Sequence, residues 1–176
     1  AVIRTYAQSD VEEFAEYSDI PTINALTDDE HPCQILTDIF TFQELRGPIR
    51  GKVVTFVGDG ACNVPLSWVY AAAALDFELR IAAPVEFQPS AETLAKAGGH
   101  IVCTEDIRAA VEGADMVYTD VWVSMGMEAE AEARLAKLAG YQINGGLMRL
   151  AKPDALGMHC LPAYRGKEID AETFEA

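Results

Sequence analysis

Short apolar runs alternate with helix-like segments along the whole chain, and this alternation limits the folds open to it. The strand-like runs are mostly β-branched and are bounded by Gly, Pro, Asp or Asn; they cover residues 1–5, 21–24, 52–57, 78–82, 100–103, 115–119 and 155–160. The remaining apolar patterns predict helices at residues 9–17, 32–45, 64–76, 90–98, 105–112, 127–139 and 145–151. Because strands that alternate with helices assemble into a parallel sheet, we expect an α/β fold with a doubly wound parallel sheet.

The stretch Gly47-Pro48-Ile49-Arg50-Gly51 is the clearest boundary in the chain. Residues 1–46 hold two predicted strands and two predicted helices, too little for a core of their own, so we expect them to be the last part of a preceding α/β domain. Residues 47–176 form a self-contained alternating array and predict a Rossmann-like domain. The helix at 32–45 would bridge the two domains, with a cleft near its start.

Neither end of the chain has the polar tail that is typical of a domain boundary. The chain begins without Met, in the strand-like stretch Ala1-Val2-Ile3-Arg4, and stops in the acidic, helix-like residues 169–176. We therefore expect a fragment of a longer enzyme, with a truncated second domain.

Composition excludes several classes of protein. The 176 residues include 13 basic and 28 acidic side chains, and the net charge of −15 disfavours nucleic acid and anionic membranes as partners. No apolar run approaches the ~20 residues of a membrane span, and the residues at the start lack the pattern of a signal peptide, so we expect none. The acidic clusters, among them residues 128–132 and 168–175, are expected on solvated helix faces, with adaptation to salt as the alternative.

The four cysteines lack the spacing of a zinc site, so no metal is expected. We expect Cys33, Cys62 and Cys103 to be small buried hydrophobes, reduced as in cytoplasmic proteins.

Two predicted helices carry capping signals. Asp10 would cap the first helix, with Glu13 completing a capping box. Ser90, with Thr93 three residues on, would start the helix at 90–98.

Three predicted strands are followed by residues that suit a ligand site. Asn63 lies just beyond the strand at 52–57, Asp120 and Ser124 follow the strand at 115–119, and Cys160 ends the strand at 155–160. Since the carboxyl ends of parallel strands share one edge of the sheet, we expect these side chains to gather there. A carboxylate and a hydroxyl four residues apart can hold the amine and the carboxylate of one small molecule.

The turn Gly58-Asp59-Gly60 is a weak signal for a dinucleotide site. The third glycine of the fingerprint is replaced by Asn63, and the next strand ends in Ala82-Ala83-Pro84 without an acidic residue. A nicotinamide cofactor is therefore disfavoured, and turn chemistry alone would explain Asp59 and Asn63.

The sequence His31-Pro32-Cys33-Gln34 opens the bridging helix. Pro32 suits the first helical position, and the free amides of that first turn favour an anion or a polarised carbonyl group. His31 and Gln34 flank the turn, although a histidine before a helix is more often a capping or surface residue. Arg4, near the end of the first strand, suits phosphate or carbonyl oxygens.

A second histidine motif, His159-Cys160-Leu161-Pro162, ends the last predicted strand. Cys160 is expected either as a core thiol before a rigid turn or as a contact to a substrate amine. Leu161, which precedes Pro162, is expected in extended geometry with its carbonyl group turned outward.

Taken together, these motifs resemble the ornithine carbamoyltransferase family. The resemblance rests on His31-Pro-Cys-Gln34, on Gly58-Asp-Gly with Asn63, on Asp120-x-x-x-Ser124-Met125-Gly126 and on His159-Cys-Leu-Pro162, all in the family's order. It implies transfer of a carbamoyl group from carbamoyl phosphate to the side-chain amine of L-ornithine, giving citrulline and phosphate. It implies no cofactor, a role in arginine metabolism and a parent protein built from trimers.

The resemblance also implies roles for individual residues. Carbamoyl phosphate would be bound by Arg4, His31, Gln34, Cys160 and Leu161. Ornithine would be bound by Asn63, Asp120, Ser124 and Met125. The catalytic groups would be Asp120, Cys160 and His31.

Some features of the family are replaced or missing. Cys62 stands where the family commonly has an Asn, and neither a Ser-x-Thr-Arg phosphate loop nor the late arginine-containing helix is found. We therefore expect the isolated chain to be inactive. Carbamoyltransferases for aspartate, putrescine or N-acylornithine are alternatives, although Ser124-Met125-Gly126 favours plain ornithine; a non-catalytic α/β binding piece is the other alternative.

Overall fold

A central sheet of five parallel strands dominates the computed structural model, which describes residues 1–124 and 126–176. The strand order is β5 (His100–Thr104), β4 (Glu78–Ala82), β3 (Val53–Val57), β6 (Met116–Thr119) and β7 (Leu156–His159). A separate two-stranded parallel sheet pairs β1 (Val2–Arg4) with β2 (Ile23–Leu26). The predicted α/β fold with a parallel sheet is confirmed.

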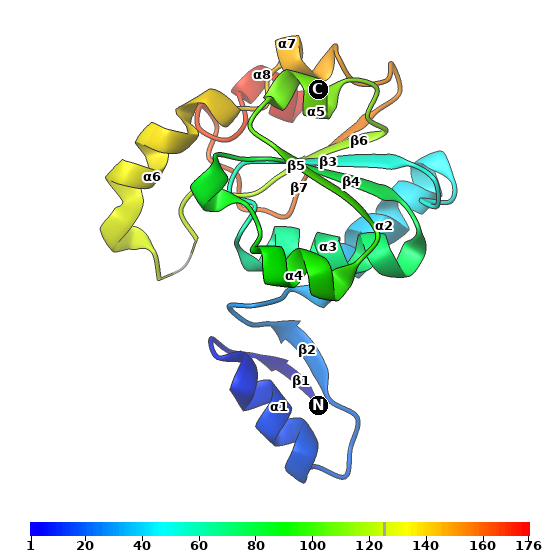
Figure 1. Cartoon of the computed structure of the whole chain (residues 1–176), viewed down its shortest axis with the longest axis vertical. Coiled ribbons are helices and arrows are strands. Elements are labelled where there is room, and N and C mark those ends of the chain that lie inside the picture. The colour runs from blue at the N-terminus through cyan, green and yellow to red at the C-terminus, as the bar shows by residue number, and fades with distance from the viewer. Residues whose placement is uncertain (125) are drawn as a thin grey trace.

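Helices cover both faces of the central sheet (Figure 1). One face carries α2 (Pro32–Arg46), α3 (Asn63–Leu75) and α4 (Ala91–Ala97). The opposite face carries α5 (Ile107–Val111), α7 (Gly145–Met148) and α8 (Ala171–Glu175). The remaining helices are α1 (Gln8–Tyr17), which packs on the small sheet, α6 (Ala131–Leu138), and the 3-10 turns η1 (Val85–Phe87), η2 (Glu128–Glu130) and η3 (Ala139–Tyr141).

The alternation of side chains in the strands divides the interior into two cores. In β3, Val54 and Phe56 point to the α2–α3 side, where Trp68 of α3 is fully buried. The next residue along the strand, Val57, belongs to the core on the α5–α7 side. Because both faces are covered, the central strands β3 and β6 are mostly apolar rather than alternately polar.

The chain order of the strands creates a crevice at the carboxyl edge of the sheet. From β3 the chain builds outward to β4 and β5, and it then returns to the other side of β3 with β6 and β7. The turns that follow β3 and β6 therefore diverge, which is the usual place for a ligand in an open α/β sheet.

Most element boundaries differ from the sequence prediction by one to three residues, and two differences have consequences for the structure. Strand β2 covers residues 23–26 rather than 21–24, because Pro21 has no N–H for the ladder and pairing begins with the bond from Ile23 N to Ala1 O (2.8 Å). The predicted helix at 127–139 is a shorter helix between two 3-10 turns.

The predicted cap at Asp10 is wrong. Helix α1 begins at Gln8, and no side chain caps it; Asp10 lies in its first turn and accepts a hydrogen bond from Thr5 Oγ1 (2.8 Å). A carboxylate there still favours the helix through the dipole. The cap at Ser90 is confirmed, since its Oγ accepts a hydrogen bond from Thr93 N (3.1 Å).

A search for membrane-spanning helices among the described residues finds none of sufficient length and apolar character.

Candidate active site

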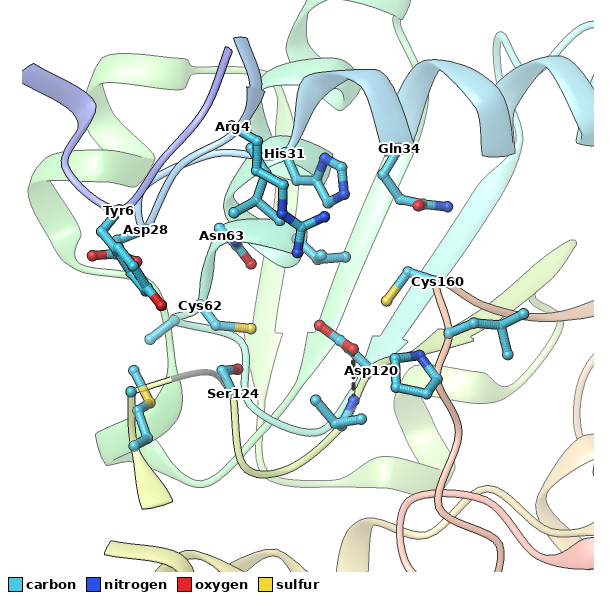
Figure 2. A pocket seen from close by; sticks show the side chains of 18 residues that line it. Arg4, Tyr6, Asp28, His31, Gln34, Cys62, Asn63, Asp120, Ser124 and Cys160 are labelled. Atoms are coloured by element: carbon cyan, nitrogen blue, oxygen red, sulfur yellow. Dashed lines mark hydrogen bonds between the residues drawn. The ribbon is translucent and has the colours of Figure 1, made fainter. Parts of the chain in front are cut away.

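A cavity of about 510 Å³ opens between the small sheet and the carboxyl edge of the central sheet. Figure 2 shows that side chains from both parts of the chain point into it. Its walls include nearly all the predicted site residues, namely Arg4, His31, Gln34, Asn63, Asp120, Ser124, Cys160 and Leu161. Met125, also predicted to bind a substrate, lies outside the described residues.

The start of helix α2 and the end of strand β1 supply the first wall. His31 occupies the N-cap position of α2, and its backbone N–H donates to Ser67 Oγ (2.7 Å) in α3. Burial and the nearby Arg4 guanidinium lower the pKa of the His31 imidazole. This direction favours the neutral ring near pH 7, although a hydrogen bond with the Ala25 backbone opposes the shift. Nδ1 is buried and forms no hydrogen bond with the described residues.

The turn after β3 joins the two parts of the chain. The side-chain amide of Asn63, at the start of α3, donates to Thr27 O (2.8 Å) in the first part. Cys62 is buried beside it, and its thiol donates to Asp59 O (3.3 Å). Burial is the main cause that raises the pKa of the Cys62 thiol, whereas a hydrogen bond with Ser124 lowers it. Ser124 and the Asn63 turn thus meet across the crevice.

Asp120 is the buried carboxylate of the cavity. It is 9 % exposed, and its Oδ1 accepts a hydrogen bond from Val121 N (2.7 Å). Burial raises the pKa of the Asp120 carboxyl group, while hydrogen bonds from Cys160 and Val121 N oppose the rise. Burial and the Asp120 charge likewise raise the pKa of the Cys160 thiol, so this cysteine is a neutral S–H donor to the carboxylate.

The turn at Cys160 is held by His159 and the buried Glu168, an interaction that the sequence analysis missed. His159 Nδ1 accepts a hydrogen bond from Leu161 N (2.8 Å), so its proton lies on Nε2, which faces Glu168 Oε1 (3.2 Å). Glu168 is fully buried and also accepts a hydrogen bond from Tyr164 N (2.5 Å). The sequence analysis placed Glu168 in a solvated acidic cluster, and this placement is wrong because its side chain closes the turn.

The predicted geometry of Leu161 is also wrong. Its φ is +59°, in the left-handed region rather than the extended one, and the peptide bond to Pro162 is cis. The hydrogen bond from Leu161 N to the His159 ring folds the chain back on itself, so the tight turn overrides the usual preference of a residue before proline. Leu161 is 60 % exposed and lines the mouth of the cavity.

Arg134 of α6 supports the cavity from behind and also escaped the sequence analysis. Its guanidinium pairs with Asp59, and its Nε donates to Trp122 O (3.1 Å). Both charged side chains are almost completely buried, and the guanidinium also lies 4.8 Å from the ring centroid of Phe87. Arg134 therefore ties the turn after β3 to the turn after β6.

The cysteines only partly match the expectation. Cys62 is buried as expected, whereas Cys33 and Cys103 are half-buried; all four cysteines are free. Ligand atoms of Asp120, His159 and Cys160 lie within 4.8 Å of one another. Because both ring nitrogens of His159 are already engaged, a metal ion at this group would have to displace Leu161 N or Glu168.

The two walls differ in chemistry. The first wall presents a guanidinium, a neutral imidazole and an amide, which suit an anion with a polar carbonyl group. The second wall presents a buried carboxylate, a thiol and a hydroxyl, which suit a substrate amine. The cavity can thus bring an amine against an activated carbonyl group.

Comparison with known proteins gives matches over nearly the whole chain. The family model "Aspartate/ornithine carbamoyltransferase, Asp/Orn binding domain" matches residues 50–176, and the model "Aspartate/ornithine carbamoyltransferase, carbamoyl-P binding domain" matches residues 1–44. The chain is 52 % identical over 174 residues to the ornithine carbamoyltransferase of Methylococcus capsulatus. It is 49 % identical over 176 residues to the anabolic ornithine carbamoyltransferase of Pseudomonas aeruginosa.

These relatives are longer than the chain. The alignments cover 99 % of this chain but 58 % and 57 % of the Methylococcus and Pseudomonas proteins. Among solved structures, ornithine carbamoyltransferase from Pyrococcus furiosus superposes with a TM-score of 0.90 at 41 % identity, over 99 % of this chain and 58 % of that one. The enzyme from Gloeobacter violaceus gives 0.89 at 39 % identity, over 99 % and 60 %.

Proposed function

The chain belongs to the aspartate/ornithine carbamoyltransferase family, and we propose that it supplies the ornithine side and part of the carbamoyl phosphate side of an ornithine carbamoyltransferase. One observation carries the proposal: Asp120 and Cys160 face His31 and Arg4 across a single cavity. This arrangement suits the attack of an amine on an activated carbonyl group.

On the ornithine side, Asp120 would bind the side-chain ammonium group. An alkylamine has a pKa of around 10, so a proton must leave before the nitrogen can attack. The raised pKa of the Asp120 carboxyl group makes it a better proton acceptor than an exposed aspartate, and Cys160 orients it. Ser124 and Asn63 would hold the backbone end of the amino acid, and Met125 remains a predicted contact.

On the carbamoyl phosphate side, Arg4 would pair with the phosphate and His31 would donate to the carbamoyl oxygen. Gln34 would bind the carbamoyl amide, and Leu161 would border the reaction centre. The nitrogen lone pair of ornithine forms the new C–N bond, the C–O bond to phosphate breaks, and phosphate leaves with the electron pair while the amine loses one proton. Much of the rate would come from holding the two substrates in line.

Ornithine is favoured over aspartate by the charge of the cavity. Among the described residues that line it, Arg4 is the only lysine or arginine, whereas Asp28 and Asp120 bring negative charge. A dicarboxylic substrate would need more cationic partners than these. Putrescine lacks the carboxylate that Ser124 would hold, and it remains the second candidate.

The same proposal extends to the organisation of the protein. Residues 1–46 would belong to the carbamoyl phosphate domain and residues 47–176 to the ornithine domain, with α2 as the bridge. The proposal also includes a trimeric parent protein, a cytoplasmic location and a role in arginine synthesis. The role in arginine synthesis is supported by the word "anabolic" in the name of the Pseudomonas relative.

A chimera tests the proposed function. Residues 1–176 replace the matching segment of the Methylococcus relative, and citrulline formation from ornithine and carbamoyl phosphate is measured by a colorimetric assay. We expect turnover by the chimera and none by the isolated chain. An inactive but folded chimera, or one that prefers putrescine or aspartate, would contradict the proposal.

A further inference from the structure

A buried carboxylate lies behind the cavity and does not line it. Asp38, one turn beyond Gln34 in α2, is 5 % exposed. A carboxylate is rarely buried to this extent unless hydrogen bonds compensate the loss of water. Asp38 has such bonds: its Oδ2 accepts from the hydroxyl of Tyr118 (2.6 Å), and both of its oxygens accept from the amide nitrogen of Gln34.

These bonds determine which way the Gln34 amide faces. Gln34 Nε2 lies 3.1 Å from Asp38 Oδ1 and 3.2 Å from Oδ2. An ionised carboxylate only accepts hydrogen bonds, so it holds the NH₂ end of the amide and excludes the C=O end. No hydrogen bond to Gln34 Oε1 is found among the described residues, and Gln34 lines the cavity. The carbonyl oxygen is thereby left for a ligand.

We propose that Asp38 is a positioning residue that keeps the carbonyl oxygen of Gln34 available in the cavity, where it accepts an N–H bond from the carbamoyl group of carbamoyl phosphate. The inference rests on the proposed function. Without Asp38, a glutamine amide can present either end, and its NH₂ end would oppose the NH₂ of the substrate.

Tyr118 connects this arrangement to the other wall. It is fully buried in β6 and packs edge-on against Trp68, with ring centroids 5.3 Å apart. Its hydroxyl donates to Asp38 and lies near the Cys160 thiol of the other wall. Asp38 is therefore held from the ornithine side of the cavity while it orients a residue on the carbamoyl phosphate side.

The test uses the citrulline-forming chimera and separates the kinetic constants. In Asp38→Asn the new amide can donate to Gln34 and turn its NH₂ end toward the substrate. We expect the KM for carbamoyl phosphate to rise about ten- to a hundredfold, because a donor then meets a donor, while the KM for ornithine changes less than about threefold. Glu44→Gln, an exposed carboxylate on the same helix, is the matched control and should change neither constant.

A reciprocal swap distinguishes positioning from simple structural support. In the double variant Gln34→Glu with Asp38→Asn, the amide introduced at position 38 donates to one oxygen of the carboxylate introduced at position 34, and the other oxygen is available to the substrate. We expect the KM for carbamoyl phosphate to fall at least about fivefold from that of Asp38→Asn alone. In the double variant, positions 34 and 38 remain hydrogen-bonded to each other, so this variant can be tested even if Asp38→Asn alone does not fold. In that case its KM for carbamoyl phosphate should lie within about tenfold of the value for the unaltered chimera.

The outcomes separate the two proposals. An inactive unaltered chimera would remove the proposed function. An active chimera whose Asp38→Asn variant raises both KM values equally, or neither, would overturn the role of Asp38 alone. A swap that gives no recovery, or a KM beyond the tenfold limit, would also overturn it.

Discussion

The two walls of the cavity are held in place in different ways. The wall from residues 47–176 stands on a five-stranded sheet with a core on each face, and its turns are fixed by the buried pairs Asp59–Arg134 and His159–Glu168. The wall from residues 1–46 combines the small sheet and α1, where Val2 and Tyr17 are 69 % and 79 % exposed, with the start of α2, whose Ile35, Ile39 and Phe42 are buried in a core of the central sheet. The small sheet and α1 thus stand outside the two cores of the central sheet, whereas α2 is packed into one of them.

Two hydrogen bonds connect residues 1–31 to helix α3. His31 N donates to Ser67 Oγ (2.7 Å), and Asn63 Nδ2 donates to Thr27 O (2.8 Å). Small polar contacts of this kind favour movement of one part against the other. The cavity residues on α2 are therefore fixed by the central core, whereas Arg4 on β1 takes its position from the smaller, more exposed part of the chain.

The largest expected effect comes from the pair that makes the second wall rigid. Arg134→Met leaves Asp59 buried without its cation, so the free energy of unfolding should fall by about 3–5 kcal/mol in urea titrations. Arg50→Met is the matched control, because Arg50 pairs with Asp76 at the surface and should contribute less than about 1 kcal/mol. Equal losses at the two sites would show that the buried pair is not what stabilises this wall.

The next effect tests the chemical division between the walls. In the chimera, Asp120→Asn should lower kcat with ornithine about a hundredfold, or about 2.7 kcal/mol, because the amine loses its buried proton acceptor. The KM for carbamoyl phosphate should stay within about twofold. A loss shared equally between the two substrates would mean that Asp120 does not serve the amine side.

A smaller effect tests how the first wall is attached. Ser67→Ala leaves His31 N without its acceptor and should cost about 1–2 kcal/mol. Hydrogen exchange should accelerate in residues 1–31 and stay unchanged in the central sheet. Thr41→Val, which removes only a bond to Thr37 O, is the control. Faster exchange throughout the sheet would contradict the separate behaviour of the two walls.

The smallest effect concerns pH at the opposite edge of the sheet. Although burial alone would raise it, the pKa of Asp115 lies below its ordinary value because Lys152, Val53 N and Lys52 favour the ionised form. Its stabilising contribution is complete above the unfolded pKa of about 4 and is lost as the pH falls through the folded value.

The pH prediction follows from this sign. Asp115→Asn should reduce the free energy of unfolding at pH 7 by less than about 1 kcal/mol, given solvent screening, and by still less at about pH 3. Urea titrations at the two pH values measure the difference. A larger loss at the acidic pH than at neutral pH would reverse the assigned sign. Asp115 lies at the amino ends of β3 and β6, whereas the cavity opens at their carboxyl ends. The pH dependence of stability measured at Asp115 is therefore independent of the cavity residues.

The sequence analysis was accurate where the chain pattern is local. The five central strands, the bridging helix and the Ser90 cap follow from apolar periodicity and from short-range capping chemistry. The residues that gather in the cavity were also predicted, because the carboxyl ends of parallel strands share one edge. Errors fell on the bounds of β2, on the cap at Asp10, on the burial of Glu168 and on the backbone geometry of Leu161.

The supporting residues behind the cavity could not be read from the pattern. Arg134, Glu168 and Asp38 sit on helix or loop positions that usually face water, and nothing in their local sequence indicates burial. Their partners are Asp59, His159 and Tyr118, which are separated from them by 9 to 80 residues. A buried charge is recognisable only once its partner is known.

By itself, the sequence determined the fold class, the edge of the sheet where the cavity lies and most of the predicted residues that line it, because periodicity and motif order depend on neighbours in the chain. Only the tertiary structure decided the tautomer of His159, the direction of the Gln34 amide and the burial of Arg134. Each of these depends on hydrogen bonds that the fold creates, and a buried polar group adopts the geometry that satisfies them.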